Sequence, residues 1–340
     1  VNIYRVRNTR FWKGNLLGRL TNWITYTLLA LYVGIFKIKP RILIVNTDPP
    51  FLGIVGYLLK KYHKVPLIFN CRDLYPDVAI ELGEIKDGFI TKIFDYLNKL
   101  SFLESDKIVP LGISMKNKIL KKGIEENKFY LIPDWADTKF LKPIIKSKNS
   151  LLKDLNLKNR FIIMYSGNIG FSQDFETILE AFKKIDSENA TLIFVGEGAA
   201  KESLRRAVSD LELRNVMFLT YQPFELLDQS LNIADLHLVP LKEGLSGSIV
   251  PSKVYGILSV GKPYLAIADE DSEPVTIAKN NNCGLWARPG DVDGISEKLK
   301  WAVNNKELLL EMGRKGREVA VKNYDKKIVI SKWVDLLSTF

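Results

Sequence analysis

The sequence predicts an α/β protein built from two doubly wound, Rossmann-like domains that face a cleft. Three observations lead to this fold class: a length of 340 residues, short apolar runs that alternate with amphipathic segments, and small or charged residues directly after several of those runs. A chain of this length exceeds one typical core and favours two domains. Strands that alternate with helices indicate parallel sheets, which bind ligands at the carboxyl ends of their strands.

The clearest strand and helix pair lies in residues 161–182. Residues 161–165 form the continuous apolar run typical of a strand buried on both faces, and the helical apolar spacing begins at Phe175. Between them lies a loop of small residues, and Ser172 or Asp174 is suited to cap the helix. Free backbone N–H groups and a positive helix end at one point suit a phosphate. Alternatively, the glycines of this loop only let the chain turn.

The first domain is predicted to span residues 1–146, and the polar residues 142–149 look like a linker. Its expected strands are residues 41–45, 66–70, 107–110 and 129–132, and its expected helices are residues 53–62, 90–105 and 114–123. Arg72, Asp73 and Asp77 closely follow the second strand, where open parallel sheets place ligands, so they are candidate site residues. Arg72 and Asp73 could instead form a structural ion pair.

The second domain is predicted to span residues 150–325, and a helix in residues 326–340 is expected to pack back on the first domain. The strands expected after residues 161–165 are 191–195, 216–219, 236–241, 264–267 and 284–286. Gly196 ends the strand at 191–195 and leads into a helix. Tyr221 and Gln222 follow the next strand, where their backbone could contact the edge of a flat ring or simply turn towards a helix.

The loop at residues 243–253 is predicted to bind phosphate rather than to be merely flexible. Its small residues, Ser246, Gly247 and Ser248, allow backbone N–H groups to converge. Ser252 is suited to cap a helix that begins at Lys253, and that lysine supplies a positive charge. The loop lacks the spacing of a nucleotide-triphosphate-hydrolysing loop, and no GxGxxG motif opens either sheet, which weakens a dinucleotide hypothesis.

The composition excludes several functional classes. The chain has only two cysteines and two histidines, so neither a disulfide framework nor a metal-ligand cluster is indicated. No GxSxG or HExxH motif supports a hydrolase. We also expect no cofactor and no nucleic-acid partner.

Positive charge is concentrated in the first half of the chain. Residues 1–150 hold 25 Lys and Arg against 13 Asp and Glu, and eight basic residues precede the first acid, with Trp12 and Trp23 among them. This pattern favours contact with an anionic membrane surface. The apolar stretch at residues 23–36 is shorter than the roughly 20 residues that span a bilayer, so we expect no transmembrane helix. The alternative for this stretch is an ordinary packed helix.

With these residues located, the chain resembles the family 4 glycosyltransferases of the GT-B fold, in particular bacterial enzymes that build O-antigen, capsule or exopolysaccharide. The resemblance covers nearly the whole chain. The motifs that carry it are DPPFLG at residues 48–53, RDLYPD at 72–77, IPDWAD at 132–137, YSGN at 165–168, FVGEG at 194–198, PSKVYG at 251–256 and GKP at 261–263.

The resemblance implies a retaining transfer of a hexosyl or N-acetylhexosaminyl group from a nucleotide sugar, usually a UDP-sugar, to a lipid-linked acceptor. The enzyme would work in the cytoplasm, peripherally on the inner face of the plasma membrane, without a metal. The resemblance implies that Arg72 and Asp73 are catalytic residues on the acceptor side. The implied donor-binding residues are Gly167, Asn168, Gly196, Tyr221, Gln222, Ser246, Gly247, Ser248, Ser252 and Lys253, with the base near Tyr221 and Gln222 and the diphosphate near Gly167, Asn168, Ser252 and Lys253.

The sequence departs from this family in three places. Asn168 stands where many members have an arginine, and Gly256 stands where they have the second acid of a glutamate pair. The first strand and its glycine-rich loop are missing, so the first domain is expected to be incomplete at its amino terminus. Two alternatives therefore remain: a UDP-sugar 2-epimerase of the same fold, and a catalytically inactive nucleotide-binding partner subunit.

Overall fold

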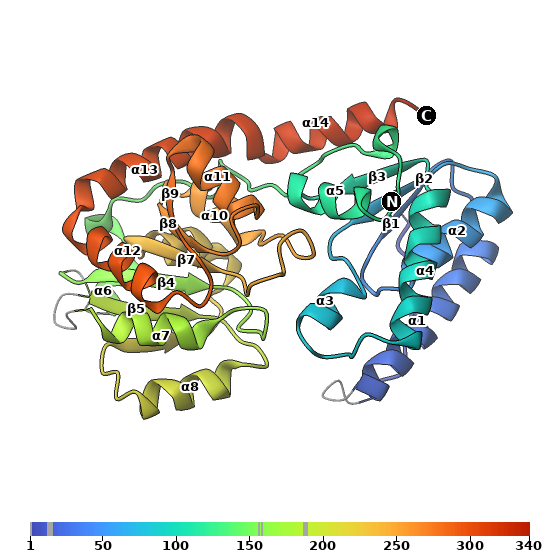
Figure 1. Ribbon diagram of the computed structural model, residues 1–340. Helices are drawn as coiled ribbons and strands as arrows, with labels where there is room; N and C mark the ends of the chain where they lie inside the picture. Colours follow the sequence, from blue (N-terminus) through green and yellow to red (C-terminus); the bar gives the residue numbers. More distant parts are fainter. Residues whose placement is uncertain (1, 12–15, 156, 158, 186–189) are drawn as a thin grey trace. The chain divides into compact units, whose positions relative to one another are not determined.

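The computed structural model describes residues 2–11, 16–155, 157, 159–185 and 190–340 (Figure 1). The chain forms two compact units. Unit 1 comprises Val1–Ile132, Gly247–Val250 and Trp333–Phe340, and unit 2 comprises Pro133–Ser246 and Pro251–Lys332. The predicted linker at residues 142–149 therefore falls within unit 2. The reason is local bonding, because Ile144 N donates to Asn232 Oδ1 over 2.9 Å and Lys146 pairs with Asp235 over 2.6 Å.

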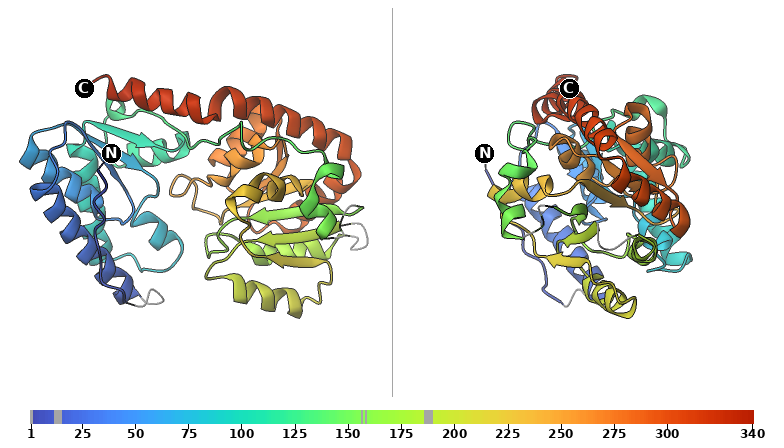
Figure 2. Two further views of the ribbon diagram at one scale, coloured as in Figure 1. Left: turned by 180° about the vertical axis from the view of Figure 1, so that it is seen from behind. Right: turned by 90° about the vertical axis from the view of Figure 1, so that its left-hand side faces the viewer.

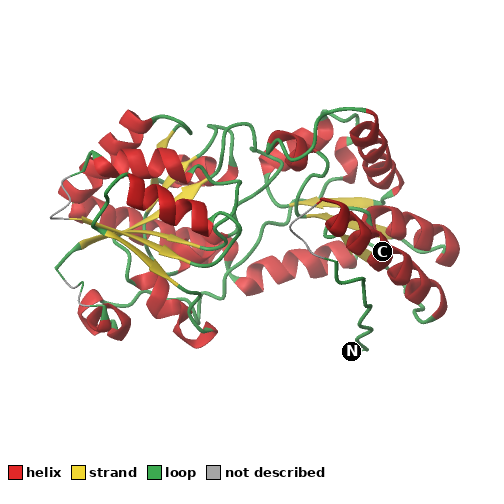
Figure 3. Cartoon of the chain, turned by 90° about the horizontal axis from the view of Figure 1, so that it is seen from below, coloured by secondary structure: helices red, strands yellow, loops and turns green. Residues whose placement is uncertain are grey.

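Unit 1 contains a parallel sheet of three strands in the order β1-β2-β3, drawn in yellow in Figure 3. The strands are β1 (Leu43–Asn46), β2 (Leu67–Cys71) and β3 (Lys107–Pro110). The helices are α1 (Leu16–Phe36), α2 (Leu52–His63), α3 (Asp77–Glu81), α4 (Phe89–Glu104) and α5 (Ile113–Leu120), with a 3-10 turn at Glu126–Lys128. Helix α2 packs against both α1 and α4.

The predicted strand at residues 129–132 is wrong. Only one parallel bridge forms there, between Ile108 and Phe129, and Tyr130 N donates to Ile108 O over 2.9 Å. The next rung of a parallel ladder would need a backbone N–H from Pro110, which proline lacks. The ladder therefore stops after one rung.

Unit 2 contains a parallel sheet of six strands in the order β6-β5-β4-β7-β8-β9 (Figure 2). The strands are β4 (Phe161–Ser166), β5 (Ala190–Val195), β6 (Val216–Leu219), β7 (Leu236–Pro240), β8 (Tyr264–Ile267) and β9 (Gly284–Ala287). Its helices are α6 (Ser150–Asp154), α7 (Phe175–Lys183), α8 (Lys201–Asp210), α9 (Leu227–Asn232), α10 (Lys253–Ser259), α11 (Glu273–Asn281), α12 (Val292–Asn304) and α13 (Lys306–Val319). Short 3-10 helices lie at Lys146–Lys148 and Phe224–Leu226, and a π-helical turn lies at Ala320–Tyr324. The last helix, α14 (Lys326–Leu337), begins in unit 2 and ends in unit 1.

The strand order of this sheet reverses between β4 and β7. Right-handed crossovers therefore place α7 and α8 on one face of the sheet, and α10 and α11 on the other. Helix α7 contacts α8 and α12, whereas α13 contacts α10 and α11. The carboxyl ends of β4 and β7 form a topological switch point, where sheets of this kind bind their ligands.

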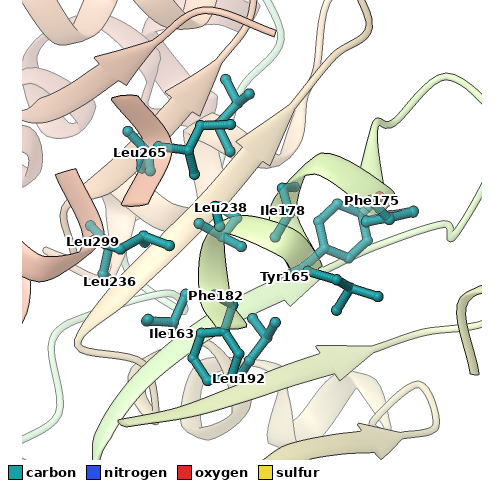
Figure 4. Close-up of a cluster of buried hydrophobic side chains, with 14 of the residues drawn as sticks. Ile163, Tyr165, Phe175, Ile178, Phe182, Leu192, Leu236, Leu238, Leu265 and Leu299 are labelled. Atoms are coloured by element: carbon teal, nitrogen blue, oxygen red, sulfur yellow. The ribbon is translucent and has the colours of Figure 1, made fainter. Parts of the chain in front are cut away.

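An apolar cluster between the sheet and α7 and α12 holds unit 2 together (Figure 4). All of its central side chains are buried because they come from continuous apolar strands and from the inner faces of the two helices. The labelled members are Ile163 and Tyr165 from β4, Leu192 from β5, Leu236 and Leu238 from β7, Leu265 from β8, Phe175, Ile178 and Phe182 from α7, and Leu299 from α12.

Helix α1 is the longest helix, with 21 residues. None of the described helices combines the length and the apolarity that a membrane crossing requires.

His237, in the middle of this sheet, provides a test of the fold. It is fully buried, its Nε2 lies 2.9 Å from Leu231 O, and burial lowers its pKa to about 3. A histidine in the unfolded chain has a pKa of about 6.5. Between the folded pKa of about 3 and this value, the unfolded chain binds more protons than the folded chain. The free energy of unfolding should therefore fall as the pH falls from about 6.5 towards 3. Between pH 7 and pH 5 we expect His237 to cost about 2 kcal/mol of unfolding free energy.

Urea unfolding of the wild type and of His237→Gln at both pH values measures this cost. The variant should lose about 2 kcal/mol less than the wild type. Equal losses in the two proteins would contradict the buried, neutral histidine.

Candidate active site

The loops that follow β4 and β5 are hydrogen-bonded to each other through their backbones. Gly167 N donates to Val195 O over 3.0 Å, and Ile169 N donates to Glu197 O over 2.9 Å. Ala200 N returns a hydrogen bond to Ile169 O over 3.0 Å. The two loops therefore form one rigid backbone surface at the carboxyl edge of the sheet.

Two glycines make this close approach possible. Gly196 and Gly198 have φ values of +145° and +158°, which L side chains rarely adopt. A Cβ atom at Gly196 would lie 2.0 Å from Gly167 O, and one at Gly198 would lie 2.1 Å from Ile169 O. Both positions are therefore restricted to glycine by the neighbouring backbone as well as by their own conformation.

Lys253, at the start of α10, reaches this surface. Its Nζ lies 3.7 Å from the centroid of the Tyr165 ring, and a Cβ built on Gly167 would lie 3.2 Å from the same Nζ. Burial lowers the pKa of Lys253 to about 7, whereas the electron-rich face of Tyr165 favours the cation. Among the described residues no carboxylate pairs with Lys253. The ammonium is thus available to an anion.

The two predicted helix caps had different outcomes. Asp174, not Ser172, caps α7: its carboxylate accepts from Thr177 N over 3.4 Å and from Thr177 Oγ1 over 2.6 Å. Ser172 Oγ instead accepts from Gln173 Nε2 over 2.7 Å. The cap predicted at Ser252 is wrong, because its φ of −67° and ψ of −17° are already helical and its side chain makes no capping bond.

Tyr221 and Asn168 lie on the same surface. The exposed ring of Tyr221 would be 3.5 Å from a Cβ built on Gly196, and neighbouring Gln222 donates to Thr220 O over 3.1 Å. Asn168 is exposed, and its backbone oxygen accepts from Tyr165 Oη over 2.5 Å. Unit 2 therefore brings Gly167, Asn168, Gly196, Tyr221 and Lys253 together.

The predicted phosphate loop divides between the two units. Ser246 belongs to unit 2, and its buried hydroxyl has no hydrogen-bond partner among the described residues. Gly247 and Ser248 belong to unit 1. A Cβ at Gly247 would lie 2.7 Å from Ser114 O, and the buried Ser248 accepts from Lys118 Nζ over 2.5 Å. Gly247 and Ser248 therefore belong to a different unit from Gly167 and Lys253.

Arg72 and Asp73 lie beside this inserted segment in unit 1. Their backbone N–H groups both donate to the buried Thr47 Oγ1, over 3.0 and 3.1 Å. Asp73 also forms an antiparallel bridge with Ile249, and Leu74 N donates to Ser248 O over 3.0 Å. The segment Gly247–Val250 thus fixes the backbone that carries both predicted residues.

Carboxylates are concentrated around Tyr75, two residues further along. Burial, followed by the negative charges of Asp73, Glu84 and Asp48, raises the pKa of Tyr75 to about 12. The other acid predicted for a site in this region, Asp77, is held in an ion pair with Lys122 over 3.0 Å. Of the three acids around Tyr75, Glu84 pairs with Arg19 over 2.9 Å, whereas Asp48 and Asp73 follow β1 and β2, where carboxylates suit the binding of hydroxyl groups.

Sequence reasoning missed three residues that shape these surfaces. The sequence pattern marks Tyr165 only as part of a buried strand, although its ring supports Lys253, and it marks Thr47 only as part of a turn. Lys201 Nζ donates to Gly196 O over 3.0 Å and to Glu197 Oε1 over 2.7 Å, and the four-residue spacing between Glu197 and Lys201 could have indicated this pair.

No group of three or more potential metal ligands occurs in the part of the chain that the structure describes.

Comparison with known proteins identifies the family. Residues 147–319, just over half of the chain, match the family described as glycosyl transferases group 1. The chain belongs to this family. It is a glycosyltransferase, and its two parallel-sheet units correspond to the GT-B fold.

Individual relatives agree with this assignment. WcaI of Escherichia coli, whose name describes a glycosyl transferase of colanic acid biosynthesis, is 26% identical over 82% of this chain and 69% of its own length. A Campylobacter jejuni protein named as an N,N'-diacetylbacillosaminyl-diphospho-undecaprenol alpha-1,3-N-acetylgalactosaminyltransferase is 23% identical over 83% of this chain and 73% of its own length. The structure of HepE from Anabaena in complex with UDP-glucose superposes with a TM-score of 0.78 at 13% identity, covering 96% of this chain and 84% of HepE.

Two glycine substitutions compare Gly196, where a Cβ atom has no room, with Gly290, where it has room. Gly290 has a φ of +73°, and no atom lies within 4 Å of the position that a Cβ would take there, so Gly290→Ala should cost only about 1–2 kcal/mol of unfolding free energy. Gly196→Ala adds a clash with Gly167 O and should cost at least about 3 kcal/mol. Urea unfolding of both variants measures the difference, and equal costs would contradict the backbone contact.

Proposed function

We propose that this glycosyltransferase is a retaining member of family 4. It transfers a hexosyl or N-acetylhexosaminyl group from a UDP-sugar to a lipid-linked saccharide during the synthesis of a cell-surface polysaccharide. The observation that carries the proposal is the backbone surface at Gly167 and Gly196 with the Lys253 ammonium beside it.

The donor diphosphate would bind where backbone N–H groups and one cation meet. Lys253 supplies the charge, since Asn168 cannot, and Ser246, Ser252 and the start of α7 add polar groups. A cation held in a desolvated position stabilises the charge that develops on the departing diphosphate more strongly than it would in water. Tyr221 and Gln222 would contact the uracil ring, and the complex of HepE with UDP-glucose supports a donor of this kind.

The acceptor would bind at unit 1, near Arg72 and Asp73. The carboxylates of Asp48 and Asp73, close to Tyr75, are suited to accept hydrogen bonds from sugar hydroxyls. The undecaprenol-linked substrate in the name of the Campylobacter relative supports a lipid-linked acceptor. We assign Gly247 and Ser248 the role of shaping this loop, in place of direct contact with the phosphates.

One experiment distinguishes this function from its two alternatives. The chain is incubated with a panel of UDP-sugars, with and without a bacterial lipid extract, and the products are analysed by mass and by the anomeric NMR signals. A transferase releases UDP and forms a retained glycoside only with lipid. An epimerase converts the donor without lipid, and an inactive partner subunit forms no product.

Lys253→Ala tests the diphosphate contact. Hydrogen bonds to charged groups contribute roughly 1.5–3 kcal/mol, so the variant should bind UDP about 10- to 150-fold more weakly. Uridine, which lacks the phosphates, should bind both proteins equally. Calorimetric titration measures both affinities, and above pH 7 the wild type should also take up a proton, because the diphosphate restores the charge on Lys253.

A matched control for this experiment is Lys300→Ala, which removes an exposed lysine from α12. The control should bind UDP as the wild type does. Unchanged UDP affinity in Lys253→Ala would instead leave the phosphates to the backbone alone and refute the proposed role.

We further propose that unit 1 attaches the enzyme peripherally to the inner, cytoplasmic face of the plasma membrane. Leu17, Ile24 and Leu28 share one face of α1, and Leu17 and Leu28 are 76% and 62% exposed. Phe89 and Ile90 at the start of α4 are exposed as well. Exposed apolar side chains with nearby basic residues suit an anionic bilayer surface.

The structure revises the aromatic part of this membrane hypothesis. Trp23 packs edge-on against Phe51 and Tyr75, with ring centroids 6.5 and 6.1 Å away, so it faces the protein. Trp12 lies outside the described residues. The apolar residues of α1 and α4 replace both tryptophans in the proposal.

Sedimentation with lipid vesicles tests the membrane proposal. Each basic residue near an anionic surface contributes about 1 kcal/mol, so binding should be strong at low salt and should weaken as salt is added. Leu17→Gln combined with Leu28→Gln should reduce binding, whereas Leu308→Gln on α13 in unit 2 should not. Equal binding to neutral and anionic vesicles would contradict the electrostatic contribution.

A further inference from the structure

A cavity lies in unit 2, at the amino-terminal edge of the six-stranded sheet. Its lining includes Phe161, the first residue of β4, Asp235, directly before β7, and Pro263, directly before β8. Its volume of about 710 Å³ is within the range of small-molecule sites. Because the surface at Gly167 and Lys253 lies at the carboxyl ends of these strands, the two sites lie at opposite edges of the sheet.

The cavity is lined by four basic residues and one acid. The basic residues are Lys146, Arg160, Lys262 and Lys306, and the acid is Asp235. Asp235 is already committed to the fold, because its Oδ2 accepts from Lys146 Nζ over 2.6 Å and from Ile162 N over 2.8 Å. The lining therefore retains an excess of positive charge after this ion pair is counted.

Lys262 and Lys306 both lack an ion pair among the described residues, and Lys262 is the more buried of the two. Arg160 donates to Thr191 Oγ1 over 3.1 Å, whereas the Lys262 ammonium has no hydrogen bond or ion pair among the described residues. Burial lowers the pKa of Lys262, Asp235 opposes this shift and Lys146 adds to it. A desolvated cation without a partner is costly to keep unless an anion joins it.

The remaining walls of the cavity are mainly apolar; of the two asparagines among them, Asn159 is exposed and Asn232 already bonds Ile144 N and Lys142 O. The apolar residues include Ile144, Val260, Leu309 and Leu310, and Leu310 is exposed at the rim. Apolar walls with a few convergent cations suit a molecule that carries an anionic group on an apolar body. A phosphate matches lysine ammonium groups as a compact, strongly charged acceptor.

We propose that this cavity is a second ligand site, which binds a phosphate-bearing small molecule through Lys262 and Lys306 and contacts the apolar part of the ligand through Leu309 and Leu310. This site is independent of the proposed donor site. It lies at the other edge of the sheet and shares no residue with it.

Calorimetric titration with phenyl phosphate tests the proposal, with phenol as the uncharged probe. The wild type should bind one equivalent of phenyl phosphate and should bind phenol at least about tenfold more weakly. Lys262→Met, which keeps the length of the side chain but removes its charge, should weaken phenyl phosphate binding at least about tenfold, and Lys262→Arg should restore most of it. Lys253→Ala should leave this binding unchanged.

Three results would overturn the proposal: no binding of phenyl phosphate, equal affinity in the wild type and Lys262→Met, or weakened binding in Lys253→Ala instead. If Lys262→Met fails to fold, the double variant Lys306→Met and Leu310→Gln, at exposed rim positions, replaces it and should weaken binding likewise. Displacement of phenyl phosphate by vesicles containing phosphatidic acid would assign the phosphate to a lipid headgroup. Binding that such vesicles do not affect assigns it to a soluble molecule.

Discussion

The backbone contact between the loops after β4 and β5 is the constraint on which the site in unit 2 depends. Gly196 and Gly198 must lack side chains because the carbonyl oxygens of Gly167 and Ile169 occupy the space of a Cβ. The reversal of strand order between β4 and β7 then leaves room beside this surface for the segment that leads to α10. Lys253 at the start of α10 therefore meets the Tyr165 ring and the Gly167 backbone without a carboxylate of the described residues to neutralise it.

Chain connectivity links this surface to unit 1. Gly247–Val250 belongs to unit 1, and only Pro251 and Ser252 separate it from Lys253. The inserted segment is held there by Leu74 N on Ser248 O and by the tight fit of Gly247 against Ser114 O. A loop that reads as one phosphate-binding motif in the sequence therefore has two roles, because its first part shapes the backbone at Asp73 and its last residue supplies the charge.

The sequence predicted those features that depend on local pattern. Continuous apolar runs located all six strands of unit 2, since strands of a sheet covered on both faces consist mainly of apolar side chains, with the buried His237 as an exception. Features that depend on tertiary contacts were missed or misread. The prediction of a strand at residues 129–132 was wrong because Pro110, in the neighbouring strand, lacks an N–H group. The prediction of a cap at Ser252 was wrong because this residue already has a helical conformation. The contact of Lys253 with Tyr165 joins residues 88 positions apart, and no periodicity in either segment indicates it.

Lys253 and Lys262, neither of which pairs with a carboxylate among the described residues, lie at opposite edges of the same sheet. Burial lowers the pKa of both, and each in turn contributes to lowering the pKa of His237 between them. Keeping a partly desolvated cation at either position costs stability relative to a neutral side chain of the same shape. An anion that binds at either edge removes part of this cost, so its binding free energy adds directly to the stability of the unit. The same charges therefore lower the stability of unit 2 and favour the binding of anionic ligands at both edges of its sheet.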